Sequence, residues 1–264
     1  MANFSTLLDA EGHFADLSVY ALREQINFLR DFRGTSDHIL TAYRSLDEVP
    51  FGTVPVGSID FVEAVLKRDH GIERVPPLQL PYPLTVPKMA IRRVFTITGV
   101  SEIPKGDWFV KPLERYKGNP PFRSKGEITL SGKYFISEYV DFEAEWRVFV
   151  FRDEILGVRQ YLGNYDRHFN SDRLKTFVRV LEEYRRASYA TVRIPIAYTL
   201  DIGLMRYKGR TFTVPVEMHH FYSCGLYGFG HTSLPSMYSA TYYELVRTFS
   251  TSDKSRDFLS RTIV

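Results

Sequence analysis

The stretch SGKYFISEYVDFEAEWRVFVF, residues 131–151, joins two apolar, strand-like runs through a group of charged side chains. The runs FISEYV and WRVFVF are rich in the β-branched and aromatic residues that favour strands. Four carboxylates lie in or between them: Glu138, Asp141, Glu143 and Glu145. Arg147 lies inside the second run, where a buried charge is costly unless a carboxylate or phosphate meets it. We therefore expect Arg147 to contact Glu143, Glu145 or a ligand, with a structural ion pair as the alternative.

Composition places few restrictions on the protein. The chain has 264 residues, 44% hydrophobic and 25% charged, which predicts one large or two modest globular domains. Its net charge of +3 permits an anionic ligand without requiring nucleic acid. Cys224 is the single cysteine, so no intrachain disulfide can form and a reducing compartment fits. Residues 1–14 do not resemble a signal peptide, and no apolar run approaches the roughly 20 residues of a membrane helix. We expect a soluble, cytoplasmic protein.

Hydrophobic periodicity predicts helices at 15–32, 55–71 and 172–187. Ser58 and Gly71 suit the two ends of the second helix, and Ser171 or Asp172 suits the start of the third. Predicted strands cover 38–43, 94–100, 107–112, 133–140, 145–151, 155–163, 196–205 and 211–219. The proline-dense segment 76–87 indicates a domain boundary.

The last two predicted strands bring carboxylates together. If their hairpin is centred on Gly209, Asp201 falls directly opposite Glu217, and His219 lies on the same face as Glu217. Like charges there repel unless a cation lies between them. The three side chains therefore form a candidate Mg²⁺ site. In another register they would be ordinary charges at strand ends.

Several cations lie around the predicted strand 107–112. Lys111 ends the run WFVKP and either reaches solvent or points into a cleft as a phosphate ligand. The following loop carries Arg115, Lys117, Arg123 and Lys125. It reads as either a solvated connector or a basic flap over a triphosphate.

Other chemistries fit the sequence less well. His219, His220, Cys224 and His231 match no common zinc spacing. A lone cysteine such as Cys224 is more often a small packed side chain than a nucleophile. The basic residues are scattered and no nucleic-acid-binding motif is present, so nucleic acid is expected only as a possible substrate.

The order of several short motifs resembles the ATP-grasp superfamily, particularly its small, often phage-associated members related to peptide and amino-acid ligases. The matching pieces run from residue 109 to residue 228: FVKP, SEYVDFEAEWRVFVF, ILGVRQY, LDIGL, VPVEMH and GLYG. The resemblance covers roughly residues 85–232, and PVGSIDFVEAVL at 55–66 is similar to the front domain of that group. It implies an α+β ATP-grasp fold in which two α+β lobes clamp ATP behind a small N-terminal α/β domain. The expected units are a pre-ATP-grasp domain at 1–85, a first lobe at 86–137 and a second lobe at 138–264.

The resemblance also implies nucleotide contacts. The backbone of Glu138, Tyr139 and Val140, with the Glu138 carboxylate, would contact the adenine edge. Glu145 would take the ribose hydroxyls, with Glu143 as the fallback. The phosphates would be met by cations: Lys111, Lys88, Lys117 and Arg147, the last also at an acyl phosphate.

In this family, Asp201 and Glu217 would hold Mg²⁺, but an Asn usually stands where this chain has His219. Because Mg²⁺ prefers oxygen ligands, His219 puts the second metal position in doubt. His219 would contact the metal or a phosphate, or the site would favour Mn²⁺, or the protein would bind ATP without catalysis.

The implied reaction is ATP-dependent carboxylate–amine (or thiol) ligation through an acyl phosphate. A non-catalytic ATP-binding module and a phosphotransferase on the same scaffold are the alternatives. The substrates would be small-molecule or peptide carboxylates and amines. Their expected contacts are Gly57 and Ser58 at a helix N-terminus, Arg159, and the Gly225–Tyr227 loop.

Overall fold

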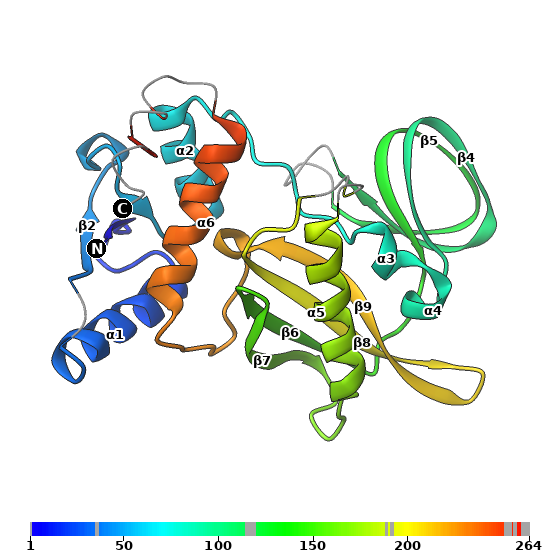
Figure 1. Cartoon of the computed structure of the whole chain (residues 1–264). Coiled ribbons are helices and arrows are strands. Elements are labelled where there is room, and N and C mark those ends of the chain that lie inside the picture. Colours follow the sequence, from blue (N-terminus) through cyan, green and yellow to red (C-terminus); the bar gives the residue numbers. More distant parts are fainter. Residues whose placement is uncertain are drawn as a thin grey trace.

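The computed structural model describes residues 2–34, 37–113, 120–187, 190, 193–250, 255, 258 and 259. The strands in these ranges form three sheets, ordered β2-β1-β3, β4-β5 and β7-β6-β8-β9. Figure 1 shows the three sheets side by side, with the first at the end that holds the N-terminus and the second at the opposite end. The four-stranded sheet therefore lies between the other two.

The N-terminal region is a small α/β unit. Strands β1 (Asn3–Leu7), β2 (Ile39–Tyr43) and β3 (Val54–Pro55) are parallel, with helices α1 (Leu17–Asp31) and α2 (Ile59–His70) and the 3₁₀ turn η1 (Leu46–Glu48) between or beside them. The predicted ends of α2 are confirmed. The Ser58 side chain accepts a hydrogen bond from the Phe61 N–H, and Gly71 adopts the left-handed conformation at φ 67°.

The second sheet is built from two unusually long strands, β4 (Val94–Pro112) and β5 (Phe122–Glu138), preceded by the short helices α3 (Tyr82–Thr85) and α4 (Pro87–Ala90). The strands predicted at 94–100 and 107–112 are thus one bent strand. Residues 134–137 of β5 pair with both ends of β4, which curls the ribbon into the ring visible in Figure 1. Gly106 permits the bend, because a Cβ there would lie 2.5 Å from the buried Trp108 ring.

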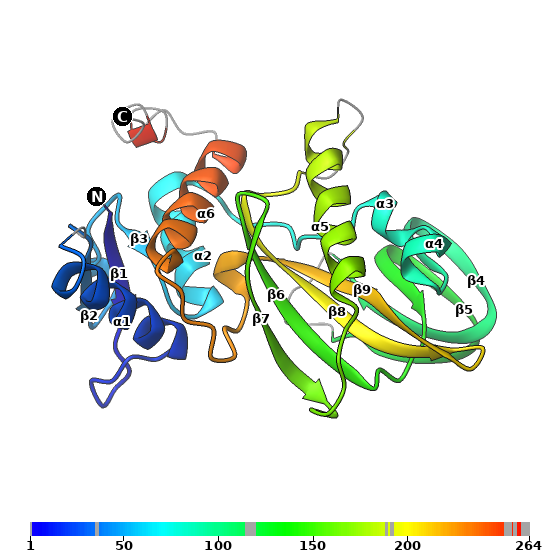
Figure 2. The same ribbon diagram turned by 60° about the horizontal axis from the view of Figure 1, so that its bottom comes forward.

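The third sheet contains β6 (Ala144–Phe151), β7 (Glu154–Gly163), β8 (Ala197–Tyr207) and β9 (Arg210–His220), all antiparallel. Helix α5 (Ser171–Arg186) covers one face of it, as Figure 2 shows. The prediction that Ser171 or Asp172 caps this helix was wrong. Asn170 lies at the cap, and its side chain accepts a hydrogen bond from the Arg173 N–H. Any short polar side chain can cap, so the residue type alone did not fix the position.

The chain returns to the N-terminal unit at its C-terminal end. After the 3₁₀ turn η2 (Phe221–Ser223), helix α6 (Leu234–Phe249) packs into the same hydrophobic cluster as α1 and α2, and Phe149 and Phe151 of β6 join that cluster. Figure 1 shows α6 beside α2. The predicted second lobe, 138–264, therefore sends its last helix to the front domain. The domain limits themselves stay a prediction.

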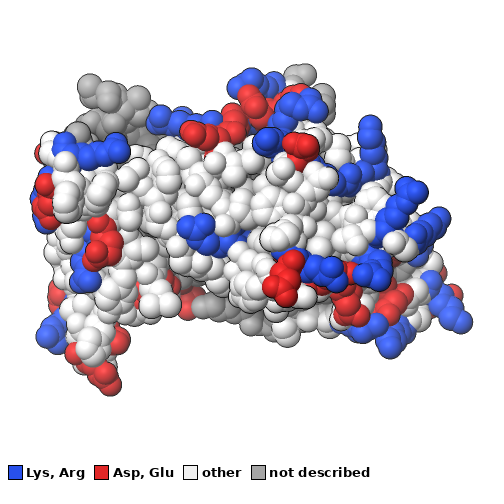
Figure 3. All heavy atoms as spheres, turned by 90° about the horizontal axis from the view of Figure 1, so that it is seen from below, with Lys and Arg blue, Asp and Glu red and all other residues white. Residues whose placement is uncertain are grey.

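The surface is mixed in charge. On the face drawn in Figure 3, basic and acidic side chains are interspersed, and uncharged side chains cover the middle. No helix in the described ranges is long and apolar enough to span a membrane.

Buried His220 makes stability depend on pH. Burial is the main reason that the pKa of His220 falls from 6.5 to about 4. The unfolded chain therefore takes up a proton first, so stability is complete above about pH 6.5 and declines as the pH falls toward 4. Between pH 7 and pH 5 we expect the wild type to lose about 2 kcal/mol more unfolding free energy than His220→Gln.

The Gln amide can still donate to the Pro76 carbonyl that pairs with His220. Urea unfolding at both pH values measures the difference. Equal losses in the two proteins would contradict the prediction.

Candidate functional site

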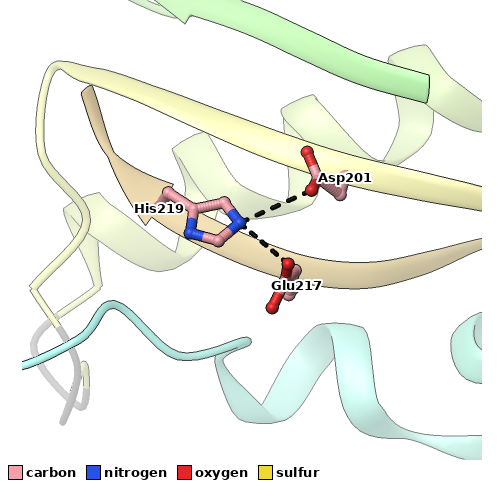
Figure 4. Close-up of side chains that lie close together, drawn as sticks. All are labelled: Asp201, Glu217 and His219. Carbon is pink, nitrogen blue, oxygen red and sulfur yellow. Dashed lines mark hydrogen bonds and ion pairs between the residues drawn. The ribbon is translucent and has the colours of Figure 1, made fainter. Parts of the chain in front are cut away.

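Asp201, Glu217 and His219 converge on one face of the β8–β9 hairpin (Figure 4). One ligand atom from each lies within 4.8 Å of the others. The predicted pairing of Asp201 with Glu217 is confirmed, but the turn is not centred on Gly209. Tyr207 pairs with Arg210, and an irregularity that skips Val216 brings Glu217 opposite Asp201. A β-bulge thus sets the register of the carboxylates.

Asp201 is held by a buried arginine. Arg147 on β6 lies directly opposite Asp201 on β8, and its Nε and Nη2 donate to the two carboxylate oxygens at 2.8 and 2.7 Å. Asp201 is 0% exposed and Arg147 is 5% exposed. Burial alone would lower the pKa of Arg147, but the hydrogen bonds to Asp201 and its charge raise it. The partner of Arg147 is therefore Asp201 rather than the expected Glu143 or Glu145.

Glu217 has a cation on each oxygen. Lys111 Nζ lies 2.5 Å from Oε2, and His219 Nε2 lies 2.9 Å from Oε1. Burial alone would raise the pKa of Glu217, but the hydrogen bond from His219 and the charges of His219 and Lys111 lower it. For His219, burial alone would lower the pKa, but its bonds to Asp201 and Glu217 raise it. Because Lys111 is on β4, the Lys111–Glu217 pair connects the second sheet to the third.

A third carboxylate, Glu145, lies close by on β6. The Tyr161 hydroxyl donates to Glu145 at 2.8 Å and also lies 3.3 Å from Asp201. Burial is the main cause that raises the pKa of both Glu145 and Tyr161. The two carboxylates and the hydroxyl therefore form one polar network beside the hairpin.

A cavity of about 280 Å³ opens beside these groups, between the second and third sheets. Six of the predicted nucleotide or metal residues line it: Lys111, Glu138, Tyr139, Val140, Glu145 and Glu217. Its walls also include Phe109, Phe135, Phe142 and Met218. Leu78 and Leu80 contribute as well, so the proline-dense segment expected as a linker forms one wall. An apolar cavity with a few convergent charges suits a small polar ligand with a flat apolar part.

Comparison with protein families identifies the chain. A sequence model of the ATP-grasp domain, the second family of its clade, matches residues 92–235, more than half of the chain. This chain belongs to that ATP-grasp family. The predicted ATP-grasp fold and α+β class are thereby confirmed.

Solved structures of other ATP-grasp proteins are similar at low identity. D-alanine–D-alanine ligase from Bacillus anthracis has a TM-score of 0.44 at 10% identity, covering 94% of this chain and 99% of that one. A RimK domain ATP-grasp protein from Sphaerobacter thermophilus has 0.44 at 11%, with the same coverages. The macrocyclase MdnC from Microcystis aeruginosa, bound to its precursor peptide, has 0.40 at 11%, also covering 94% and 99%. No curated protein matches.

Not every residue expected from the ATP-grasp resemblance lies at the cavity. Lys88 is exposed on α4 and does not line it. Arg92, which sequence reasoning passed over, lines it and is 5% exposed, and burial lowers its pKa to about 10. Arg92 donates to the carbonyls of Ala90 and Pro215, and within the described residues no carboxylate pairs with it. The signal was the RRVF motif that leads into β4.

The hinge residues reach the cavity, but their polar groups are largely engaged. The Glu138 carboxylate binds the Arg93 guanidinium and backbone N–H at 2.6 and 2.9 Å. The Glu138 N–H donates to the Arg93 carbonyl, and the Tyr139 N–H donates to the Asp107 carbonyl. The expected adenine contacts of Glu138 therefore require Arg93 to move.

The predicted substrate residues lie in two places. Arg147 Nη1 donates to the Gly225 carbonyl, Arg159 Nε donates to the Gly228 carbonyl, and the Tyr227 ring stacks on Tyr161 with centroids 5.0 Å apart. The 225–228 loop is thus fixed beside Arg147. Gly57 and Ser58 start α2 in the N-terminal unit and line none of the cavities described here. Lys117 and Arg115 lie outside the described residues.

The zinc and nucleophile alternatives find no support in the described residues. There, His220 bonds to the Pro76 carbonyl, and the Cys224 thiol donates to the Phe221 carbonyl. Burial raises the pKa of Cys224 to about 12, so the thiol stays protonated at neutral pH. Asp201, Glu217 and His219 remain the metal-type cluster of the described chain.

The Arg147–Asp201 pair should be strongly coupled to stability. Arg147→Met leaves Asp201 buried without its main partner, so we expect a loss of about 3 kcal/mol in unfolding free energy. Arg159→Met is the matched control, since Arg159 faces Arg147 on β7 and bonds to backbone carbonyls. Its expected loss is below about 1 kcal/mol. Urea unfolding compares the two, and similar losses would show that Asp201 does not depend on Arg147.

Proposed function

We propose that this protein is an ATP-dependent carboxylate–amine (or thiol) ligase that works through an acyl phosphate. Membership of the ATP-grasp family supports ATP as the co-substrate. The observation that carries the proposal is the cavity in which Lys111, Glu145 and Glu217 meet beside Asp201. A cation, a ribose-type acceptor and paired carboxylates are the parts that a metal–nucleotide complex needs.

In this proposal the base lies in the apolar part of the cavity, near Tyr139 and Val140. Glu145 accepts hydrogen bonds from the ribose hydroxyls. Lys111 and Arg92 neutralise phosphate oxygens, and Arg92 takes the place first expected for Lys88. Arg147 positions Asp201, and a contact of Arg147 with phosphate would require that pair to open.

The donor set suits a divalent cation. Asp201 and Glu217 supply carboxylate oxygens, as Mg²⁺ prefers, and His219 supplies an imidazole nitrogen that Mn²⁺ accepts more readily. A divalent ion held there would neutralise charge on the phosphates.

The chemistry needs no side-chain nucleophile. A carboxylate oxygen of the acid attacks the γ-phosphorus of ATP, ADP leaves, and the acceptor amine then attacks the acyl carbon and displaces phosphate. The residues of the cavity contribute position and charge neutralisation. The acid and amine are small molecules or peptides, and we expect the reaction in the cytoplasm.

A second candidate is an ATP-binding module without turnover. It is favoured by His219 standing at a metal position and by cations on both oxygens of Glu217. ADP release measured across panels of acids and amines, with products analysed by mass spectrometry, separates the candidates. An amide or thioester product supports the ligase. ATP binding without turnover supports the module, and a stable phosphorylated product without an amide supports a phosphotransferase.

Glu217 should be needed for metal-dependent nucleotide binding. We expect Glu217→Gln to weaken binding of ATP with Mg²⁺ by about tenfold or more, because one negative ligand is lost. Glu183→Gln on α5 is the control; its side chain is 60% exposed and pairs with Arg179. Calorimetry in Mg²⁺ and in Mn²⁺ measures both variants, and an unchanged affinity in Glu217→Gln would remove the metal site from the proposal.

The assignment of Glu145 to the ribose can be tested with 2′-deoxy-ATP. If Glu145 accepts from the 2′-hydroxyl, the wild type should prefer ATP by about tenfold, the value of one hydrogen bond to a charged group. Glu145→Ala should bind both nucleotides equally, whereas Glu143→Ala should keep the preference. If Glu143→Ala loses the preference instead, the ribose contact belongs to Glu143.

A further inference from the structure

The Lys111–Glu217 pair occupies the position that a metal ion would need. Glu217 has two carboxylate oxygens, and each already has a cation beside it: Lys111 on Oε2 and His219 on Oε1. The Lys111 side chain comes from β4 in the second sheet and crosses to β9 in the third. A divalent ion cannot bind Glu217 beside that ammonium group without strong repulsion.

Of the charged partners at this site, Lys111 is the one able to leave. The Arg147 side chain is 7% exposed and grips both oxygens of Asp201, which is fully buried. Breaking that pair would leave two buried charges unpaired. Lys111, in contrast, is 29% exposed on a flexible four-carbon stem.

Lys111 also has a destination. Its side chain lines the cavity assigned above to the nucleotide, alongside Glu145 and Arg92. A phosphate group entering that cavity would offer the ammonium a new partner within reach of its stem. One lysine can thus serve Glu217 or a phosphate, but not both at full strength.

We propose that Lys111 is the resident counter-cation of Glu217 and that a divalent ion displaces it into the nucleotide cavity. This inference rests on the proposed metal and nucleotide sites. It makes metal and nucleotide binding interdependent, because the ion frees the lysine that the phosphates require. By reciprocity, phosphates that draw Lys111 away from Glu217 strengthen metal binding there.

The test is a Mn²⁺ titration without nucleotide, followed by electron paramagnetic resonance and calorimetry. Removing the competing ammonium with Lys111→Met should tighten Mn²⁺ binding by about fivefold, the scale of a partly exposed ion pair. Lys111→Arg keeps the positive charge and should match the wild type. Lys125→Met makes the same charge change at an exposed position of β5 and should also match it.

A merely structural lysine would behave differently. Its loss would lower the unfolding free energy in urea without tightening Mn²⁺ binding. Unchanged or weaker Mn²⁺ binding by Lys111→Met, or equal tightening in Lys125→Met, would overturn the proposal. So would the absence of Mn²⁺ binding in both the wild type and Lys111→Met.

The result is separable from the ligase assignment. Tighter Mn²⁺ binding in Lys111→Met, with no ATP turnover by the wild type, would support the exchange and remove the ligase. Amide formation by the wild type with unchanged Mn²⁺ affinity in Lys111→Met would do the reverse.

Discussion

The central constraint in this molecule is the meeting of two carboxylates across the β8–β9 hairpin. Asp201 and Glu217 face each other at a position where Asp201 has no contact with water. Such a pair can persist only when cations compensate it. Arg147 compensates Asp201 from the neighbouring strand, and Lys111 compensates Glu217 from a different sheet. The relative placement of the two sheets is therefore tied to one pair of negative charges.

The two faces of the third sheet have separate tasks. One face packs Val148, Leu200 and Ile202 against α5 in an apolar cluster. The other face carries Arg147 and Asp201, and beyond them Phe149 and Phe151 join the cluster that includes α6 and the N-terminal unit. Strand alternation places these two sets on opposite sides. Rigid packing on the first face thereby fixes charged groups on the second, which is how a stable scaffold holds a polar site.

Elements with local signals were predicted well. Helix α2 was bounded correctly because Ser58 and Gly71 act within their own turn of the chain. The opposition of Asp201 and Glu217 was also predicted, although it depends on a bulge at Val216 that compensates for the off-centre turn at Lys208 and Gly209. Lys88 was preferred to Arg92 for the opposite reason. The left-handed turn at Ile91 decides which of these cations faces the cavity, and the β-branched Ile carries no local signal for that conformation.

The sequence by itself determined the ATP-grasp family, the order of the strands along the chain and the residue types of the site. These follow from patterns that repeat every two or three to four residues, and from the order of short motifs. Only the tertiary structure decided that Arg147 pairs with Asp201, that Lys111 reaches Glu217 and that the proline-dense segment forms a cavity wall. Each of these contacts joins residues far apart in the chain, and a buried charge takes whichever opposite charge the packed sheets bring within reach.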